Sequence, residues 1–269
     1  MCKLLNQNIL ITGGASGIGK LMCEMALDRG IGKLVIFDID KIKLAEVVNQ
    51  FKKINQNVFG FVVDVSNTNQ IIKTLQIVKK KIGSIDILIN NAGIIIGKNF
   101  NEHSHKEIDF TLSINTNALM HIALELLPEM ILRGSGHIVN IASAAGFVSN
   151  PKMSVYVASK FAVVGWSDSL RLEMERNKTG VHVSTVTPYY IDTGMFAGVK
   201  TLIPILKPEY AAKKIINGIE KNKIFIKMPF LIKLLPLFKG LLPLRVFDFV
   251  VGDLLRTYNT MNNFTGRNK

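Results

Sequence analysis

The sequence contains little cysteine, with only Cys2 and Cys23 among 269 residues. Two cysteines give neither a metal-ligand spacing nor a disulfide framework, and neither is a candidate catalytic residue. The five histidines also lack metal-ligand spacing with acidic residues. We therefore expect no metal site and no disulfide, and the low cysteine content fits a reducing, cytoplasmic compartment.

Long apolar stretches are missing as well. No uncharged apolar run reaches the roughly 18 residues that indicate a transmembrane helix. The N-terminal residues enter a strand pattern at Asn8, which leaves no room for a signal peptide. We expect a cytoplasmic protein, either in solution or peripheral on a membrane.

Acidic residues are few, since 20 Asp and Glu stand against 33 Lys and Arg, for a formal net charge of +13. The excess is uneven, because residues 198–269 hold ten Lys and three Arg against four acidic residues. No nucleic-acid-binding motif accompanies this charge, so we predict no nucleic-acid partner and assign the basic excess to the surface of the tail.

What the sequence does contain is an alternation of short Val- and Ile-rich runs with longer helical patterns, which predicts βαβ units and a parallel sheet. The predicted strands are 8–12, 33–37, 58–63, 86–90, 137–142, 181–186 and 224–226. The predicted helices are 17–29, 41–54, 67–82, 104–130, 155–177 and 208–221. We expect an α/β, doubly wound, Rossmann-like fold with helices on both faces of a seven-stranded parallel sheet. One domain spans 1–226, and 227–269 is an extension rather than an independent domain.

The first predicted turn carries a glycine motif, T12-G-G-A-S-G-I-G19, between a strand and a helix. Gly13, Gly17 and Gly19 permit a tight turn, close approach of the backbone to a pyrophosphate, and close packing of helix on sheet. The helix N-terminus, with Ser16 and Ile18 in the loop that opens it, offers N–H groups to phosphates. The motif predicts a dinucleotide site.

Asp38 ends the second predicted strand, where its carboxylate would accept hydrogen bonds from both ribose hydroxyls and repel a 2′-phosphate. Ser16 supplies no basic group inside the glycine loop, so we favour NAD over NADP, although Lys41 and Lys43 follow closely. Asp64 and Val65 end the third strand. They either lie beside an adenine ring, or Asp64 caps the next helix.

A third pattern places Ser143 thirteen residues before Tyr156, and Lys160 one helical turn after it. A nearby ammonium favours phenolate over phenol, so Lys160 should lower the Tyr156 pKa from about 10 toward the working pH. Ser143 can hydrogen-bond the same substrate oxygen. The pattern predicts a proton-transfer unit.

Together with N90-N-A-G93, Asn115 and P188-x-x-x-x-T193, these motifs resemble the short-chain dehydrogenase/reductase family in its single-domain form. All of them occur in the family's order and approximate spacing, over roughly residues 6–226. Within the family, the stretch around Tyr156 and the tail with its LLP segments resemble the branch of retinol dehydrogenases and lipid-droplet hydroxysteroid dehydrogenases.

The resemblance implies a catalytic set of Asn115, Ser143, Tyr156 and Lys160, in which Asn115 bends a long helix and holds a water that links Lys160 to solvent. It implies further cofactor contacts from Asn91, Ala92, Gly93, Pro188, Ile191 and Thr193, and from Tyr156 and Lys160 themselves. Tyr189 departs from the family, which usually has glycine there. Its phenol would narrow the nicotinamide pocket or line the substrate cavity.

The same resemblance implies a homodimer or homotetramer through helices 104–130 and 155–177. Both helices carry apolar residues on more than one face, which need to be covered: Leu119, Ile122, Leu126, Phe161, Val164 and Leu170.

Two classes of function follow. The first is an enzyme that moves hydride between NAD(H) and an alcohol or carbonyl carbon of an apolar lipid, retinoid or steroid-like substrate. The alternatives are an NADP-dependent ketoreductase of acyl or small polar substrates, and a binding protein of the same fold that does no chemistry. The complete set of four catalytic residues favours the enzyme.

The tail from 227 to 256 spaces its basic residues six apart, at Lys227, Lys233, Lys239 and Arg245, among Leu, Phe and Pro. Pro229, Pro236 and Pro243 break any continuous helix. Short apolar pieces flanked by basic residues are typical of interfacial segments. The tail therefore either contacts a membrane surface, or folds over the active site as a lid or extends a subunit interface.

Overall fold

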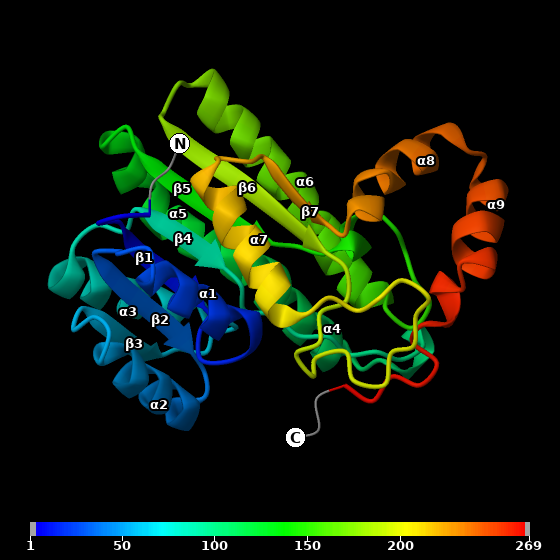
Figure 1. Cartoon of the computed structure of the whole chain (residues 1–269), viewed down its shortest axis with the longest axis horizontal. Helices are drawn as coiled ribbons and strands as arrows, with labels where there is room; N and C mark the ends of the chain where they lie inside the picture. The colour runs from blue at the N-terminus through cyan, green and yellow to red at the C-terminus, as the bar shows by residue number, and fades with distance from the viewer. Residues whose placement is uncertain (1–3, 267–269) are drawn as a thin grey trace.

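The computed structural model describes residues 4–266 and contains one parallel sheet of seven strands in the order β3-β2-β1-β4-β5-β6-β7 (Figure 1). Cys2 lies outside the described residues. The strands are β1 (Asn8–Thr12), β2 (Lys33–Asp38), β3 (Val58–Val62), β4 (Ile87–Asn90), β5 (Gly136–Ile141), β6 (Val181–Pro188) and β7 (Phe225–Met228). The predicted doubly wound, Rossmann-like fold is confirmed. β7 continues to Met228, two residues beyond the expected end of the domain at 226.

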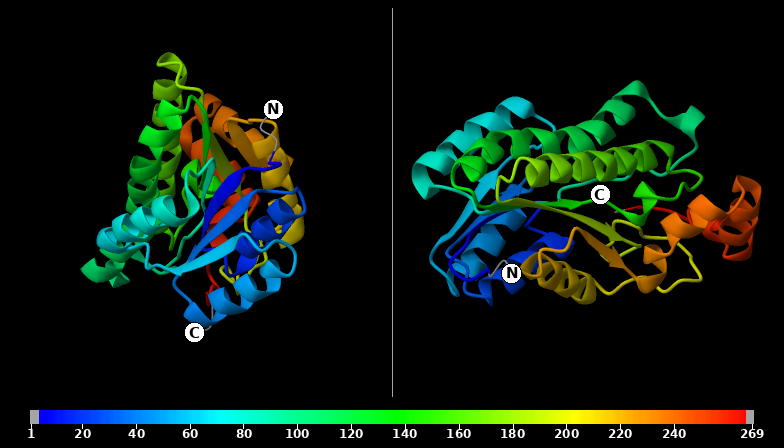
Figure 2. Two further views of the ribbon diagram at one scale, coloured as in Figure 1. Left: turned by 90° about the vertical axis from the view of Figure 1, so that its left-hand side faces the viewer. Right: turned by 90° about the horizontal axis from the view of Figure 1, so that it is seen from above.

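Helices cover both faces of the sheet, as Figure 2 shows from above and from one end. One face carries α1 (Gly17–Leu27), α2 (Lys41–Lys52) and α7 (Pro208–Glu220). The other carries α3 (Thr68–Ile82), α5 (Ala118–Leu132) and α6 (Ser154–Arg176). The result is a three-layer α/β/α domain.

The central strands are buried along almost their whole length because each of their faces meets a helical layer. In β1, Ile9 and Ile11 pack toward α1 and α7, while Leu10 between them packs toward α3 and α5. Successive side chains of a strand point to opposite faces, so a strand covered on both sides must be apolar at every position. This explains why the sequence shows continuous apolar runs rather than alternation.

The predicted helix 104–130 is not α-helical throughout. It consists of α4 (His105–Leu112), a π-helical turn (Ser113–Asn117) and α5. At the centre of the π turn, the fully buried Asn115 exchanges hydrogen bonds with the backbone of Ile94. A π turn inserts one extra residue into the helical ladder, and here it turns Asn115 toward the loop after β4.

The tail folds into short helical pieces, as its prolines predict. These are η4 (Phe230–Lys233), α8 (Leu235–Leu241), α9 (Leu244–Phe247), a π-helical stretch η5 (Asp248–Leu254) and η6 (Thr257–Asn259). α8 and α9 project from the right-hand end of the molecule in Figure 1. The chain then returns to the body, where Thr265 N–H donates to the Ala197 carbonyl (2.9 Å). Within residues 4–266, no helix combines the length and the apolar character that a membrane crossing requires.

A buried histidine lies between β5 and β6. His137 Nε2 lies 2.8 Å from Ser184 Oγ, which donates its own hydrogen to the Lys223 carbonyl (2.6 Å). Nε2 must therefore carry the hydrogen, and the buried Nδ1 has no partner among the described residues. Burial lowers the pKa of His137 to about 3, and the neighbouring His182 adds to the shift.

This histidine should make the protein sensitive to acid. The unfolded chain binds a proton near pH 6.5 and the folded chain only near pH 3, so the stabilisation is complete above pH 6.5 and is lost as the pH falls toward 3. The slope is at most about 1.4 kcal/mol per pH unit. His137→Gln keeps a donor for Ser184 but cannot titrate, so its free energy of unfolding in urea should fall less between pH 7 and pH 5. The exposed His105→Gln serves as the control, and equal slopes for all three proteins would contradict the assignment.

Candidate active site

A groove of about 250 Å³ lies where the strands end, next to the point between β1 and β4 at which the strand order reverses. Ligands of open α/β sheets bind at this position. The structure brings nearly all of the predicted cofactor residues to its wall: Gly13, Ser16, Gly17, Ile18, Gly19, Asp38, Val65, Asn91, Ala92, Gly93, Tyr156, Lys160, Pro188, Ile191 and Thr193.

The glycine loop has the shape that a dinucleotide pyrophosphate requires. Gly13 and Gly17 adopt positive φ angles of 64° and 53°, which side chains rarely tolerate. A Cβ on Gly19 would overlap the Gly13 carbonyl oxygen. Ser16 precedes α1 without capping it through its side chain, so the first N–H groups of the helix stay available to an anion. The loop therefore fits the phosphates of a dinucleotide.

Asp38, at the end of β2, holds this loop in place. One carboxylate oxygen accepts from Ala15 N–H (2.9 Å) and the other from Asp40 N–H (3.0 Å). A carboxylate oxygen has more than one acceptor site, so Asp38 can still accept from a ribose hydroxyl in the groove. The residue thus has a structural role that the sequence did not indicate.

Asp64 does not line the groove, whereas Val63 and Val65 on either side of it do. Its carboxylate accepts from the N–H and the hydroxyl of Ser66 (2.9 and 2.7 Å). The cap of α3 is Asn67, which accepts from Gln70 N–H. Asp64 is therefore not the cap of α3, because its side chain closes the turn after β3, and its predicted place beside an adenine ring stays a prediction.

Thr12 was missing from the predicted site residues, although it begins the glycine motif. Its hydroxyl oxygen accepts from the N–H groups of Asn91 and Ala92 (2.9 and 3.0 Å). The Asn91 side chain returns a hydrogen bond to the Thr12 carbonyl (2.9 Å). These bonds join the loops after β1 and β4, which form the floor of the groove.

Tyr156 and Lys160 lie one turn apart in α6, as predicted, and both are buried. The Lys160 ammonium donates to the Ile141 carbonyl at the end of β5 (2.9 Å) and lies 5.7 Å from the centre of the Tyr156 ring. Ser143 lies two residues after Ile141, at the start of a short 3₁₀ turn, and its Oγ accepts from Ala145 N–H (3.1 Å). The hydroxyl hydrogen of Ser143 is therefore free for another acceptor.

The expected lowering of the Tyr156 pKa by Lys160 is not found in this structure. Burial raises the pKa of the phenol well above its ordinary value, the nearby Ser143 hydroxyl opposes this rise, and Tyr190 adds to it. Burial also lowers the pKa of Lys160 to about 8. The physical reason is that desolvation disfavours both charged forms, while the ammonium is directed at the Ile141 carbonyl.

Asn115 positions the site from behind and does not line the groove. Its Oδ1 accepts from Ile94 N–H (2.8 Å), and its Nδ2 donates to the Ile94 carbonyl and to Ser159 Oγ (2.9 and 3.1 Å). It therefore links the loop after β4 to α6 next to Lys160. Its predicted role in holding a water stays a prediction.

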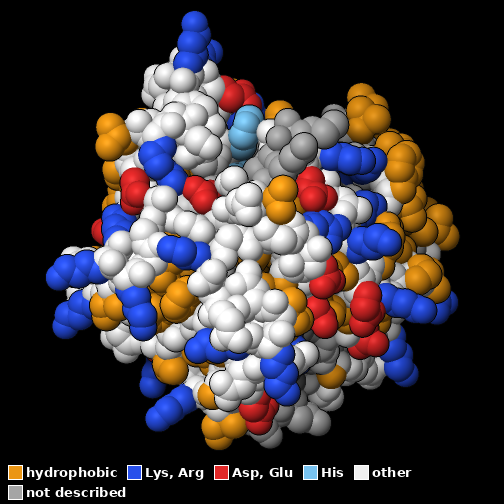
Figure 3. All heavy atoms as spheres, turned by 60° about the vertical axis from the view of Figure 1, so that its left-hand side comes forward, with side chains coloured by type: hydrophobic (Ala, Val, Ile, Leu, Met, Phe, Trp, Pro, Cys, Tyr) orange, Lys and Arg blue, Asp and Glu red, His pale blue; other side chains and the backbone are white. Residues whose placement is uncertain are grey.

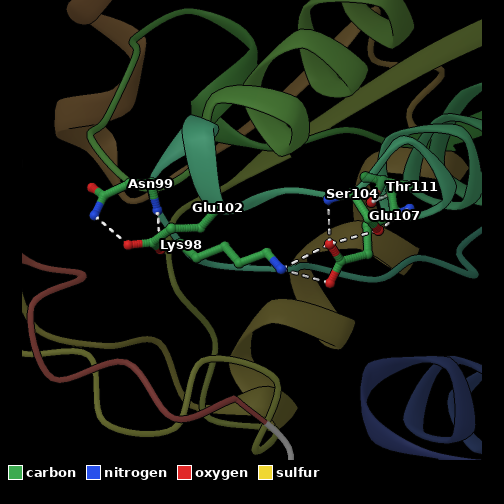
Figure 4. Close-up of polar contacts among 6 residues, drawn as sticks. All are labelled: Lys98, Asn99, Glu102, Ser104, Glu107 and Thr111. Atoms are coloured by element: carbon green, nitrogen blue, oxygen red, sulfur yellow. Dashed lines mark hydrogen bonds and ion pairs between the residues drawn. The ribbon is translucent and has the colours of Figure 1, made fainter.

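The loop that follows Ile94 is tied down at its far end, as Figure 4 shows. Glu102 accepts from the backbone and side chain of Asn99, and Glu107 accepts from Ser104, so two capping boxes stand in succession. Lys98 forms an ion pair with Glu107 (2.7 Å) and, with Ser104, lowers the pKa of Glu107 to about 2. This loop joins β4 to α4.

A second cavity, of about 310 Å³, adjoins the groove. Ser143, Tyr189 and Phe196 line both spaces. The remaining wall is mostly aliphatic and comes from the loops after β5 and β6 and from the tail, and no charged residue or histidine belongs to it. Tyr189 borders this cavity, as one of its two predicted roles requires, with its hydroxyl 2.6 Å from Thr201 Oγ1.

Phe196 was not predicted. Its ring packs edge-on against Tyr156 and Tyr190, with centroid distances of 6.1 and 4.9 Å. It lies in the loop between β6 and α7, and the sequence gives no sign of which side chain in that loop turns inward.

Comparison with known proteins assigns the chain to a family. A family model described as short chain dehydrogenase matches residues 7–202. The chain is 33% identical to epidermal retinol dehydrogenase 2 of Mus musculus, covering 97% of this chain and 86% of the mouse protein. It is 38% identical to 17-beta-hydroxysteroid dehydrogenase 13 of Mus musculus, covering 84% and 75%.

Solved structures support the same family assignment. A short chain dehydrogenase/reductase from Burkholderia phymatum in complex with NAD has a TM-score of 0.80 at 25% identity, covering 93% of this chain and 96% of that one. A short-chain dehydrogenase from Sphingobium yanoikuyae in complex with NADPH has a TM-score of 0.78 at 26% identity, covering 92% and 95%. The two neighbours hold different dinucleotides, so they do not select between NAD and NADP.

The position of Tyr156 leads to a test by substitution. Tyr156→Phe keeps the ring but removes the proton that passes between the phenol and a substrate oxygen, so turnover should fall by about a hundredfold or more. Binding of the dinucleotide, measured by calorimetry, should change little. Tyr190→Phe is the matched control, because it removes a neighbouring buried phenol that hydrogen-bonds Thr260 and Asn150. Turnover of Tyr156→Phe within a few-fold of the parent would exclude Tyr156 as the acid/base.

Proposed function

The chain belongs to the short chain dehydrogenase family, a family of oxidoreductases that act on CH–OH groups, and from this premise we propose that it transfers hydride between NAD(H) and an apolar alcohol or its carbonyl. One observation carries the proposal. Ser143 lines both a dinucleotide-shaped groove and an apolar cavity, and Tyr156 lines the same groove.

The chain's own residues have separate roles in the proposed reaction. When bound, the dinucleotide supplies or accepts the hydride. In the direction of reduction, Tyr156 gives its phenolic proton to the substrate oxygen, and Ser143 donates a hydrogen bond to the same atom. In the direction of oxidation, Tyr156 takes the proton back. The raised pKa of Tyr156 keeps it a phenol at neutral pH before any ligand binds. The Lys160 ammonium, 5.7 Å from the centre of the ring, stabilises the phenolate relative to a site without a cation, but burial outweighs this effect and leaves the Tyr156 pKa raised.

The shape and chemistry of the second cavity support an apolar substrate. Its lining offers no cation for a carboxylate or a phosphate and no acid for an amine. Burying a charged group in such a place is unfavourable, which disfavours the alternative of an acyl or small polar substrate. A binding protein without chemistry is disfavoured because the four predicted catalytic residues are all present and Ser143, Tyr156 and Lys160 reach one groove. Retinoids and steroids, the substrates named for the two relatives, belong to the class we propose.

The preference for NAD rests on Asp38. Its carboxylate stands at the ribose end of the groove, fixed by two backbone donors, and the Lys43 ammonium pairs with Asp40 (2.7 Å) on the outside of α2 rather than in the groove. A 2′-phosphate would meet a negative charge at this point, and among residues 4–266 Lys160 is the only basic residue that lines the groove.

A screen of secondary alcohols, retinoids and sterols against NAD and NADP, followed at the absorbance of the reduced nicotinamide, tests the proposal together with Asp38. The parent should prefer NAD and an apolar alcohol. In Asp38→Asn, which keeps an acceptor but loses the charge, the preference for NAD over NADP should shrink by about tenfold. Asp38→Ala also loses the loop contacts, so it should bind both dinucleotides less well. A parent that prefers NADP, or that oxidises only small polar alcohols, would refute the proposal.

We also propose a homodimer or homotetramer, although the residues first expected at its interface are mostly in the core. Leu119, Ile122, Leu126 and Leu170 are buried within the chain itself. Phe161 of the predicted set is exposed, and the other exposed apolar side chains on α5 and α6 are Leu124, Ile131, Leu132 and Leu172. Light scattering at micromolar concentration should show at least a dimer, and Leu124→Glu should lower the mass to that of the 29.9 kDa chain. A parent that is already monomeric would exclude the oligomer.

The tail closes the substrate cavity, and we propose that its outer side makes a peripheral contact with a lipid surface in the cytoplasm. Leu231, Leu235 and Phe238 line the cavity, which supports the lid. Exposed Leu and Phe side chains on the same segment, among basic residues, support the lipid contact. The two roles are compatible, because a roof that lies on a lipid surface opens toward the phase in which an apolar substrate dissolves.

A further inference from the structure

The roof of the substrate cavity, defined as residues 230–256, has apolar side chains on both of its sides. Ile232, Leu234 and Leu242 face the cavity. Leu237, Leu241, Leu244 and Phe249 face away from it, with 56 to 71% of their surface exposed. A soluble chain rarely exposes so many large apolar side chains on one segment without a partner for them.

The charges beside this outer surface are positive and largely unpaired. Lys227, Lys233, Lys239, Arg245 and Arg256 form no ion pair within residues 4–266, as the ion pairs there all involve other cations. Of the two acids in the roof, Asp248 accepts a hydrogen bond from Tyr258 (2.6 Å). Figure 3 brings forward the end of the molecule opposite α8 and α9; Lys and Arg side chains project around its outline, and hydrophobic side chains gather along the right-hand edge. Apolar side chains flanked by unpaired cations complement an anionic phospholipid surface.

One of these cations also attaches the roof to the body of the protein, residues 4–228. Lys239, in α8, donates to the Phe147 carbonyl (2.8 Å) and lies over the Phe161 ring, 5.0 Å from its centre. Phe147 ends the short turn that begins at Ser143. Among the described residues, this is the only hydrogen bond from the roof to residues 4–228. The rest of its contact with the body is apolar packing.

We propose that Lys239 is a latch that anionic phospholipid releases. An anionic phosphate oxygen is a stronger acceptor for the ammonium than the neutral Phe147 carbonyl, so docking on an anionic bilayer draws Lys239 outward. α8 then loses its polar attachment, and the cavity beside Ser143 opens toward the lipid. The inference rests on the proposed function for its purpose, but the latch itself concerns only the roof.

Binding is tested first, with the full chain and two kinds of vesicle, pure phosphatidylcholine and phosphatidylcholine with phosphatidylserine. The protein should float with the anionic vesicles at low salt and be released at high salt. Lys233→Met and Lys239→Met should each weaken flotation by a similar factor, because each removes one charge from the same surface. Equal flotation with both kinds of vesicle, or no flotation, would overturn the anionic surface.

The opening of the roof is tested next, by a measurement that does not depend on catalytic turnover. Met153 lines the cavity and is 2% exposed, so Met153→Cys, made in a Cys2→Ser background, places a thiol inside it, while Cys23 stays fully buried. The rate at which N-ethylmaleimide labels this thiol measures how often the roof opens. Anionic vesicles should raise the rate about fivefold, the change expected when a hydrogen bond and a cation–π contact of modest strength are lost, and phosphatidylcholine vesicles should leave it unchanged.

Lys233→Met is the matched control for the latch, because Lys233 lies over Phe230 within the roof and does not reach the body. Without vesicles, Lys239→Met should raise the labelling rate about as much as anionic vesicles do in the parent, while Lys233→Met should not change it. Equal rates in Lys239→Met and the parent would overturn the latch, even if the protein is an active dehydrogenase. An increase in Lys239→Met would support it, even if the alcohol screen fails.

Discussion

The buried ammonium of Lys160 is the constraint on which the site depends. An isolated charge in a protein interior is strongly unfavourable unless it is hydrogen-bonded. Its partner is the carbonyl of Ile141, the last residue of β5. A carbonyl at the end of a strand no longer belongs to the ladder of the sheet, so it is free to accept. α6 must therefore cross the sheet at the height at which its second turn meets the end of β5, and this requirement also fixes Tyr156 one turn earlier.

Other features of the site follow from the same requirement. Gly93 faces the ammonium and Asn115, and a Cβ there would lie 3.3 Å from Asn115 Oδ1 and 3.8 Å from Lys160 Nζ. The π turn directs Asn115 into the remaining space, where its amide satisfies both backbone groups of Ile94. A regular α-helix over the same residues would place this side chain on a different face. The π turn is thus the irregularity that lets the wall behind the buried ammonium pack well.

The sequence predicted the sheet, the helical layers and the groove because these depend on short-range patterns. Apolar runs such as that of β1 identify buried strands, and a strand, a glycine loop and a helix in succession identify the phosphate site. The positions of Tyr156 and Lys160 follow from helical spacing alone. The direction of the Tyr156 pKa could not be predicted in this way, since it depends on how completely the loop with Phe196 and Tyr190 removes water from the phenol. The helix cap considered for Asp64 was wrong for a related reason, because Ser66, two residues later, donates to its carboxylate and Asn67 caps α3 instead.

The roof shows where sequence patterns stop being informative. Its composition indicated an apolar, basic segment broken by prolines, which is compatible with a lid and with a lipid contact. Only the fold shows that both descriptions apply to the same residues, since Phe238 lines the cavity and is also 45% exposed. An apolar substrate has low solubility in water and gains little from a site that opens only to water. When the wall of the site is itself the lipid-facing surface, the substrate does not have to cross water, because it passes from one apolar environment to another.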